Sequence, residues 1–242
     1  MRTVAIIQAR MGSTRLAGKV LLDLAGEPML ARVMHRVQRA SLLDEVMIAT
    51  TIHPADDAIA QLCAARGWPC ARGSPEDVLD RYYQAARVSQ ADVVVRITSD
   101  CPLIEPEVID QVIHEFLAHQ PKADYASNVQ SPRTFPRGLD TEVMRFDALA
   151  RAWREDTNPA WREHVTPYIY RHPERFRLHD VVNAVDLSSL RWTVDTAQDL
   201  EFVRRIYARF GGDTFTWRDV LALLEQHPDW LEINRTVEQK VV

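Results

Sequence analysis

The chain has 242 residues, of which 46% are hydrophobic and 26% are charged, an ordinary composition for a globular protein. This composition excludes a disordered, collagen-like or coiled-coil chain. The formal net charge of -5 argues against a broad nucleic-acid-binding or membrane-binding surface, because such surfaces rely on an excess of basic residues. We therefore expect neither a nucleic acid nor a membrane as a partner.

The chain also lacks the sequence marks of export. Its longest apolar runs are far shorter than the roughly 18 residues that a membrane helix needs, and residues 1–3 lead directly into a strand-like run. Three cysteines, Cys63, Cys70 and Cys101, form no C-x-x-C pair and favour neither a disulfide framework nor a zinc site. These features predict a soluble protein of the reducing cytoplasm.

The first half of the chain alternates two kinds of apolar pattern. Short, nearly continuous runs rich in Val and Ile are typical of strands that are buried on both faces of a parallel sheet. Apolar residues at helical spacing lie between and after these runs. The alternation predicts an α/β protein with a doubly wound, mostly parallel sheet. Strands are expected over residues 3–9, 45–51 and 91–98, and helices over residues 29–37, 59–63, 78–86 and 108–117.

From about residue 120 to residue 186 the pattern breaks, because prolines interrupt short polar and aromatic segments. It resumes with a predicted strand over 190–194 and predicted helices over 197–210 and 217–225. We therefore interpret residues 1–242 as one domain, with an inserted, extended subdomain at about 120–186. The insertion contains many large apolar side chains and no evident core of its own, which predicts a homodimer interface there.

The loop over residues 8–19 follows the first predicted strand and contains Gly12, Gly18, Arg10, Arg15 and Lys19. Glycines permit the turns that direct backbone N–H groups toward an anion, and the three cations add charge. The loop is not a Walker A motif, because five residues separate the glycines and Val follows the lysine. We interpret it as a polyphosphate-binding loop; a basic surface loop is the alternative.

Two carboxylates lie where predicted strands end. Asp100 follows the strand over 91–98, and Asp195 follows the strand over 190–194. Two carboxylates at one edge of a sheet form a hard-oxygen site, which Mg²⁺ typically occupies together with substrate phosphates. The alternative for Asp195 is a helix cap, and for Asp199 the cap is the preferred interpretation.

Together these segments resemble the cytidylyltransferases that activate acidic sugars, including the N-acylneuraminate and 3-deoxy-manno-octulosonate enzymes. That family has an A-R-x-x-S-x-R-L-x-G-K loop, a strand-end Asp before Pro-Leu, and a late V-D-T-x-x-D-L motif. The resemblance is strongest to the branch of spore coat polysaccharide biosynthesis proteins and covers about residues 3 to 235. Its further marks here are Arg72-Gly73-Ser74, Gly138-Leu139-Asp140 with Glu142, and Arg162-Glu163-His164.

The resemblance implies a Rossmann-like nucleotide-diphospho-sugar transferase fold, Mg²⁺ as cofactor, and CTP and a sugar as substrates. The reaction would join CMP to an acidic sugar for surface polysaccharide synthesis and release pyrophosphate. Arg10, Arg15, Lys19 and Asp100 would be catalytic, and Asp100 and Asp195 would bind the metal. The nucleotide would also contact Ala9, Gly12, Ser13, Gly73, Ser74 and Arg96, and the acceptor would contact Asp140, Glu142 and His164.

Each assignment has a structural alternative. His164 beside Glu163 is also typical of a paired structural histidine, and Asp140 and Glu142 are also typical of a solvated strand edge. Two rival functions remain: a glycosyltransferase that uses a ready-made nucleotide sugar, and a nucleotide-binding subunit without turnover. An Asp-x-Asp motif would favour the glycosyltransferase, but Cys101 and Pro102 follow Asp100. The sequence names neither the sugar nor, strictly, the base.

Overall fold

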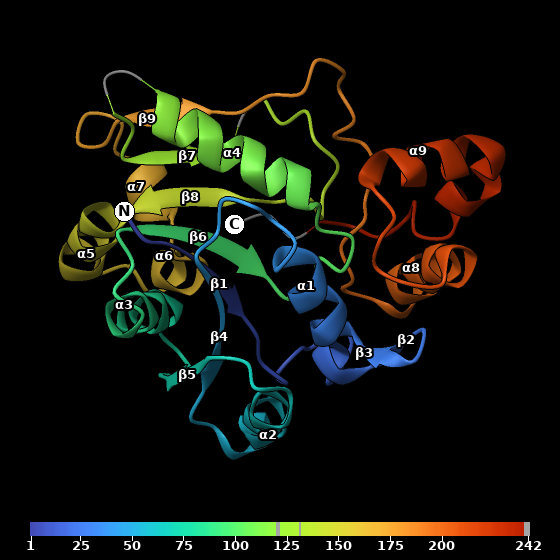
Figure 1. Ribbon diagram of the computed structural model, residues 1–242, viewed down its shortest axis with the longest axis horizontal. Helices are drawn as coiled ribbons and strands as arrows, with labels where there is room; N and C mark the ends of the chain where they lie inside the picture. Colours follow the sequence, from blue (N-terminus) through green and yellow to red (C-terminus); the bar gives the residue numbers. More distant parts are fainter. Residues whose placement is uncertain (120–121, 131, 240–242) are drawn as a thin grey trace.

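The computed structural model describes residues 1–119, 122–130 and 132–239. Its main sheet has seven strands and a two-stranded hairpin lies beside it (Figure 1). The strands of the sheet are β1 (Thr3–Gln8), β4 (Glu45–Thr51), β5 (Cys70–Gly73), β6 (Val93–Thr98), β7 (Tyr125–Ser127), β8 (Glu142–Arg145) and β9 (Leu178–Asp180), and those of the hairpin are β2 (Asp23–Leu24) and β3 (Glu27–Pro28).

The strand order in the sheet is β5-β4-β1-β6-β8-β7-β9. β1 pairs in parallel with both β4 and β6, whereas β8 is antiparallel to its neighbours β6 and β7. Parallel strands place their carboxyl ends at the same edge, so the segments after β1 and β6 emerge side by side. The predicted mostly parallel, Rossmann-like sheet is confirmed.

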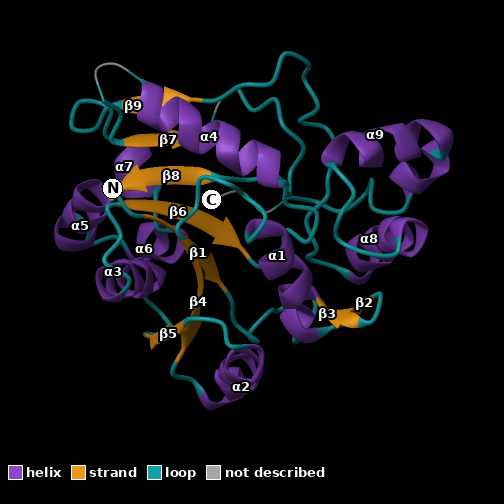
Figure 2. Ribbon diagram, in the orientation of Figure 1, coloured by secondary structure: helices purple, strands orange, loops and turns teal. Residues whose placement is uncertain are grey.

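Helices cover both faces of the sheet (Figure 2). Successive β1 residues alternate between the two cores, with Ala5 and Ile7 on one face and Val4 and Ile6 on the other. Burial on both faces explains why the sequence shows continuous apolar runs there. The helices are α1 (Met29–Val37), α2 (Asp57–Arg66), α3 (Val78–Val88), α4 (Pro106–Ala118), α5 (Phe146–Glu155), α6 (Pro159–His164), α7 (Pro167–Tyr170), α8 (Ala197–Phe210) and α9 (Trp217–Gln226).

The region at 120–186 contributes β7, β8 and β9 to the main sheet and α5, α6 and α7 to one of its faces. Its side chains Phe135, Tyr168 and Ile169 are buried within their own chain. They pack into the two cores that flank the main sheet, so their number no longer argues for a partner chain. Sequence patterns did not show this, because the strands of the region are short and polar turns separate them. A homodimer stays a prediction, now without that support.

The strand predicted over 190–194 is also wrong. Only Arg191 forms a single parallel bridge, to Arg137. Within that bridge the Arg137 N–H donates to the Leu190 carbonyl at 2.9 Å, and its carbonyl accepts from the Trp192 N–H at 2.7 Å. A single bridge is too short to form the continuous backbone hydrogen-bond ladder that defines a strand. Its apolar residues are buried by packing instead, and Trp192 is fully buried.

The short strand β5 is not evident in the sequence, because its four residues are too few and too polar to show a pattern. Glu105 caps α4, and Asp77 caps α3. Thr196 and Asp199 form a reciprocal capping box at the start of α8, as preferred for Asp199. No helix among the described residues is long and apolar enough to cross a membrane.

Gly138 allows the bridge between Arg137 and Arg191 to form. Its φ is +108°, and an added Cβ would lie 2.8 Å from the carbonyl carbon of Trp192. We expect Gly138→Ala to lower the free energy of unfolding by about 2 kcal/mol, because it combines backbone strain with overpacking against a buried backbone. Denaturant unfolding measures this, with Gly212→Ala as control, since nothing lies within 4 Å of its Cβ position. Equal midpoints for the two variants would contradict this packing.

Candidate active site

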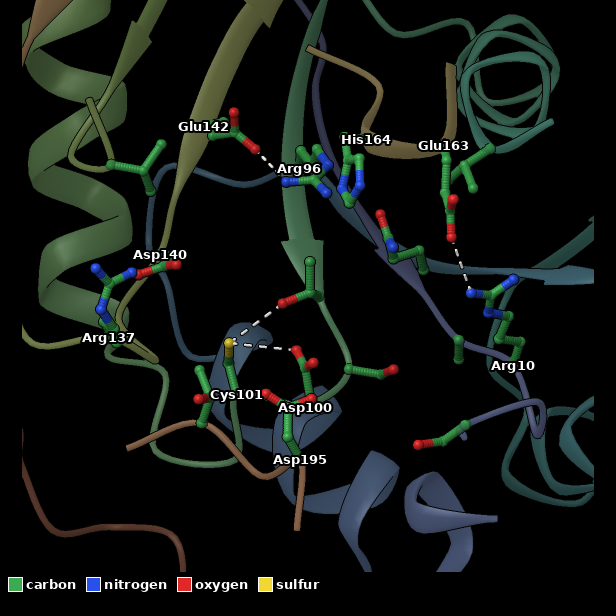
Figure 3. A pocket seen from close by; sticks show the side chains of 18 of the residues that line it. Arg10, Arg96, Asp100, Cys101, Arg137, Asp140, Glu142, Glu163, His164 and Asp195 are labelled. Atoms are coloured by element: carbon green, nitrogen blue, oxygen red, sulfur yellow. Dashed lines mark hydrogen bonds and ion pairs between the residues drawn. The ribbon is translucent and has the colours of Figure 1, made fainter. Parts of the chain in front are cut away.

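A cavity of about 790 Å³ opens at the carboxyl ends of β1 and β6 (Figure 3). Gln8 and Ala9 enter it from the end of β1, and Thr98, Ser99 and Asp100 enter it from the end of β6. It also receives residues from the 120–186 region, which closes one side. Among the predicted site residues it gathers Ala9, Arg10, Gly12, Ser13, Arg15, Lys19, Arg96, Asp100, Asp140, Glu142, His164 and Asp195.

Gly73 and Ser74 do not line this cavity. Gly73 ends β5, where an added Cβ would lie 2.9 Å from the Arg81 side chain, and the Ser74 carbonyl accepts a hydrogen bond from Arg81 at 2.5 Å. Gly73 therefore leaves room for Arg81, and Ser74 holds it; Arg81 itself does line the cavity. Direct contact of Gly73 and Ser74 with a nucleotide stays a prediction.

The loop after β1 is folded back on itself and anchored to the sheet. The Met11 carbonyl accepts hydrogen bonds from the N–H groups of Ser13 and Gly18, at 2.8 and 3.2 Å. The Met11 N–H donates to the carboxylate of Asp56 at 2.6 Å, and Asp56 is 3% exposed. This anchoring holds the basic residues of the loop at the mouth of the cavity.

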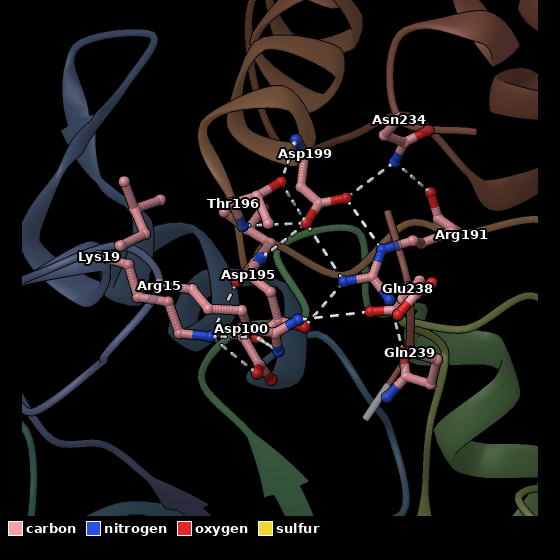
Figure 4. Close-up of polar contacts among 12 residues, drawn as sticks. Arg15, Lys19, Asp100, Arg191, Asp195, Thr196, Asp199, Asn234, Glu238 and Gln239 are labelled. Atoms are coloured by element: carbon pink, nitrogen blue, oxygen red, sulfur yellow. Dashed lines mark hydrogen bonds and ion pairs between the residues drawn. The ribbon is translucent and has the colours of Figure 1, made fainter. Parts of the chain in front are cut away.

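The ammonium group of Lys19 joins three segments (Figure 4). Its Nζ lies 3.0 Å from Oδ2 of Asp100, 2.9 Å from Oδ1 of Asp195 and 2.8 Å from the Val194 carbonyl oxygen. Burial acts to lower the pKa of Lys19, but the two carboxylates outweigh it and leave this pKa raised. For Asp100, burial acts to raise the pKa, and Lys19 outweighs it and leaves it lowered. Lys19 and Asp100 are thus charged together.

Asp195 has further cationic partners. Arg15 lies 2.9 Å from its Oδ1, and Arg191 lies 2.8 Å from its Oδ2. Arg191 is in turn held by Asp199, whose carboxylate is fully buried and also caps α8. Sequence reasoning therefore recognised the cap at Asp199 and missed its second role, which is to position the arginine that holds Asp195.

Glu142 lies at the base of the cavity and binds Arg96 across the pair β6 and β8. Its Oε1 also accepts hydrogen bonds from the hydroxyls of Tyr125, at 2.6 Å, and Thr166, at 2.7 Å. Burial acts to lower the pKa of Arg96, and Glu142 outweighs it and leaves it raised. These contacts make Glu142 a residue that positions Arg96, while sugar binding by Glu142 stays a prediction.

His164 faces the cavity next to an unusual turn. Val165 has φ 71° and ψ -54°, and the Thr166 N–H donates to the His164 carbonyl at 2.9 Å, which is a γ-turn. A β-branched residue at positive φ is strained, and such strain is retained where the surrounding structure fixes it. Burial and the neighbouring Arg96 lower the pKa of His164, so the imidazole is neutral near pH 7.

Sequence reasoning missed several lining residues, chiefly Arg81, Arg133 and Arg137. Arg133 forms a two-pronged ion pair with Asp140, at 2.6 and 3.2 Å. A signal was present, because both Arg133 and Arg137 lie just before the Gly138-Leu139-Asp140 motif. The described lining includes seven Arg or Lys side chains and five carboxylates, so the cavity suits an anionic ligand.

Cysteine nucleophilic chemistry has no support at this site. Cys101 is 1% exposed, and burial together with Asp100 raises the pKa of its thiol well above the usual value. The thiol therefore stays protonated, and the thiolate is the nucleophilic form. The chemistry available here is the binding and positioning of charged oxygen groups.

Comparison with known proteins places this site in a family. Residues 4–214 match the family described as Cytidylyltransferase. The chain is 37% identical over 242 residues to an uncharacterized protein of Methanocaldococcus jannaschii, covering 99% of this chain and 97% of the other. It is 32% identical to the spore coat polysaccharide biosynthesis protein SpsF of Bacillus subtilis, covering 93% and 94%.

A solved cytidylyltransferase from Leptospira borgpetersenii superposes with a TM-score of 0.91 at 30% identity, covering 100% of this chain and 99% of the other. The structure of a CMP:2-keto-3-deoxy-manno-octonic acid synthetase complexed with CTP shares the fold, with a TM-score of 0.67 at 21% identity, covering 86% and 99%. The match to the family extends over most of the chain and includes the loop after β1 and the segment with Asp195. This chain therefore belongs to the cytidylyltransferase family and is a nucleotidyltransferase.

Proposed function

We propose that this protein is a Mg²⁺-dependent cytidylyltransferase that joins CMP from CTP to an acidic sugar, with release of pyrophosphate, for surface polysaccharide synthesis. The observation that carries the proposal is the convergence of Asp100 and Asp195 on one cation at the carboxyl edge of the sheet. The names of its relatives support it, since they include SpsF and 3-deoxy-manno-octulosonate cytidylyltransferases, one of which, from Geobacter sulfurreducens, is 38% identical over 149 residues, covering 60% of this chain and 57% of the relative.

The residues present fit a hard dication. Three oxygen atoms, from Asp100, Asp195 and Val194, surround a single cationic position that the Lys19 ammonium fills. Among the described residues no group of three or more His, Cys, Asp or Glu side chains could hold a metal by itself. Asp100 and Asp195 would hold Mg²⁺ together with phosphate oxygens and water, which is its usual coordination. When bound, Mg²⁺ would neutralise phosphate charge and acidify an attacking hydroxyl.

The chain's own residues would supply the positioning. Arg10, Arg15 and Lys19 extend from one anchored loop and can hold the three phosphates of CTP through charge-assisted hydrogen bonds. Lys19 would exchange its carboxylate partners for phosphate oxygens in doing so. A hydroxyl oxygen of the acceptor would attack the α-phosphorus and give up its proton to water. The bond between the α-phosphorus and the oxygen that bridges it to the β-phosphorus would break, and pyrophosphate would leave with the negative charge that the basic loop stabilises.

The direct test is incubation of the protein with CTP, Mg²⁺ and a panel of acidic and neutral sugars. We expect pyrophosphate release together with a CMP-sugar product for an acid in the panel. Pyrophosphate release and mass spectrometry of the product provide the measurement. A glycosyltransferase would leave CTP intact and consume a ready-made nucleotide sugar, and a binding subunit would release nothing, so either result would contradict the proposal.

Asp100→Asn keeps the shape of the side chain and removes the charge that a hard dication requires. We expect turnover at limiting Mg²⁺ to fall by at least about 100-fold. The variant should stay folded, because Lys19 keeps Asp195 as a partner. Initial rates across a Mg²⁺ titration measure the effect, with the exposed Asp229→Asn as control. Unchanged rates at limiting Mg²⁺ would exclude Asp100 as a metal ligand.

Arg15→Ala removes one charged phosphate contact, which is worth about 1.5–3 kcal/mol, so the dissociation constant for CTP should rise about 10- to 100-fold. Lys19→Ala should weaken CTP binding similarly. It should also lower the free energy of unfolding by about 3 kcal/mol, because two partly buried carboxylates lose their shared cation. Calorimetric titration with CTP and denaturant unfolding separate the two effects.

The exposed Arg87→Ala is the control for these two variants. If both Arg15→Ala and Lys19→Ala bound CTP as the wild type does, the loop after β1 would not be the triphosphate site.

A further inference from the structure

Arg137 differs from every other basic residue of the cavity. Its side chain lines the cavity, yet it forms no hydrogen bond or ion pair with any residue within 1–119, 122–130 and 132–239. The other basic side chains are engaged: Arg10 with Glu163, Arg15 and Lys19 with Asp195, Arg81 with the carbonyls of Ser74 and Pro75, Arg96 with Glu142, and Arg133 with Asp140.

The backbone of Arg137 is fixed, although no described residue holds its side chain. Its N–H and carbonyl both bond to the segment over 190–192, and Gly138 packs directly against the Trp192 backbone. Side chains that protrude from a rigid backbone into a cavity are prepared for a ligand, because less ordering is needed when the ligand binds. The point from which the guanidinium extends into the cavity is therefore fixed.

The surroundings of Arg137 disfavour its positive charge. Burial lowers the pKa of Arg137, and the neighbouring Arg133 and Arg191 lower it further. Asp140 acts in the opposite direction, but both of its carboxylate oxygens already accept hydrogen bonds from Arg133. An anion placed against Arg137 would offset this repulsion, so the local charge favours an anionic ligand.

The position of Arg137 indicates which anionic group of the substrates would bind to it. In Figure 3, Arg137 lies beside Asp140. Arg10 lies on one side of Asp100 and Asp195, and Arg137 lies on the other. If the triphosphate lies along the loop over residues 9–19, in-line attack places the acceptor on the side away from the leaving pyrophosphate. Arg137 lies on that side. This step rests on the proposed function, because it takes the triphosphate position from it.

We infer that Arg137 binds the carboxylate of the acceptor sugar and thereby selects acidic over neutral acceptors. A guanidinium presents two parallel N–H groups that match the two oxygens of a carboxylate. A neutral acceptor would cover this partly buried charge without pairing it, which is a strong basis for discrimination. A phosphate of CTP offers similar oxygen chemistry, so the experiment must separate the two anions.

The test compares wild type with Arg137→Gln, Arg137→Lys and the exposed control Arg209→Gln. The probes are CTP, 3-deoxy-manno-octulosonate, N-acetylneuraminate, and the carboxamide of each acid. Calorimetry measures the binding of CTP alone and of each acid in the presence of a non-hydrolysable CTP analogue. Steady-state kinetics with CTP then measures the KM and kcat for each acid and each carboxamide.

For an acid that the wild type binds, we expect Arg137→Gln to weaken binding and raise its KM by about 10- to 100-fold. CTP affinity should change less than about twofold, and the preference for the acid over its carboxamide should nearly disappear. Arg137→Lys should recover part of the loss, because it restores the charge without the paired N–H groups. Arg209→Gln should behave as wild type.

Three results would overturn the inference. The first is that Arg137→Gln binds the acid as wild type does. The second is that it weakens the binding of CTP and acid equally, which would assign Arg137 to a phosphate. The third is that the wild type uses neutral sugars and binds neither acid, which would remove the acceptor carboxylate while leaving nucleotidyl transfer from CTP intact. The proposed function fails in a different way, by the absence of pyrophosphate release with any acceptor.

Discussion

The Lys19 ammonium, shared between Asp100 and Asp195, connects the parts of the site that are most distant in sequence. It joins the loop after β1, the end of β6 and the segment before α8 through three contacts of 2.8 to 3.0 Å. Removing one member of such a partly buried group leaves an uncompensated charge, which is costly. The same arrangement gathers two carboxylates at a single cationic position. Structural cohesion and the proposed metal chemistry therefore depend on the same atoms.

Around this centre, carboxylates hold arginines in place instead of meeting solvent. Asp199 holds Arg191, which holds Asp195, and Glu142 holds Arg96 with help from two hydroxyl groups. Each carboxylate thus limits the motion of a cation at the cavity wall. A preorganised set of charges stabilises a developing anion without reorganising when the reaction occurs. Arg137 is the exception, because no residue in the described part of the chain pairs with its guanidinium, and we therefore assign it a ligand.

Much of the fold follows from local patterns. Continuous apolar runs predicted β1, β4 and β6 because both faces of these strands are buried, and apolar residues at helical spacing predicted α1, α3 and α4. Local patterns failed where elements are short. The strands β7, β8 and β9 have three or four residues each, and their pairing with the sheet depends on neighbours more than on their own sequence. Over 190–194 the sequence predicted a strand that does not form. Apolar residues of this segment are buried, as in a strand, but no neighbouring strand pairs with it.

The sequence by itself determined that the basic loop after β1 and Asp100 after β6 reach the carboxyl edge of the sheet, whereas Asp195 reaches it without the strand that was predicted before it. It did so because the strand pattern and the chain order fix where each segment emerges. Only the tertiary structure decided which charges pair. Lys19 and Asp195 are separated by 176 residues, and Arg96 and Glu142 by 46. Pairs this distant leave no periodic trace in the chain, so whether a cation such as Arg137 stays free for a ligand is decided by packing alone.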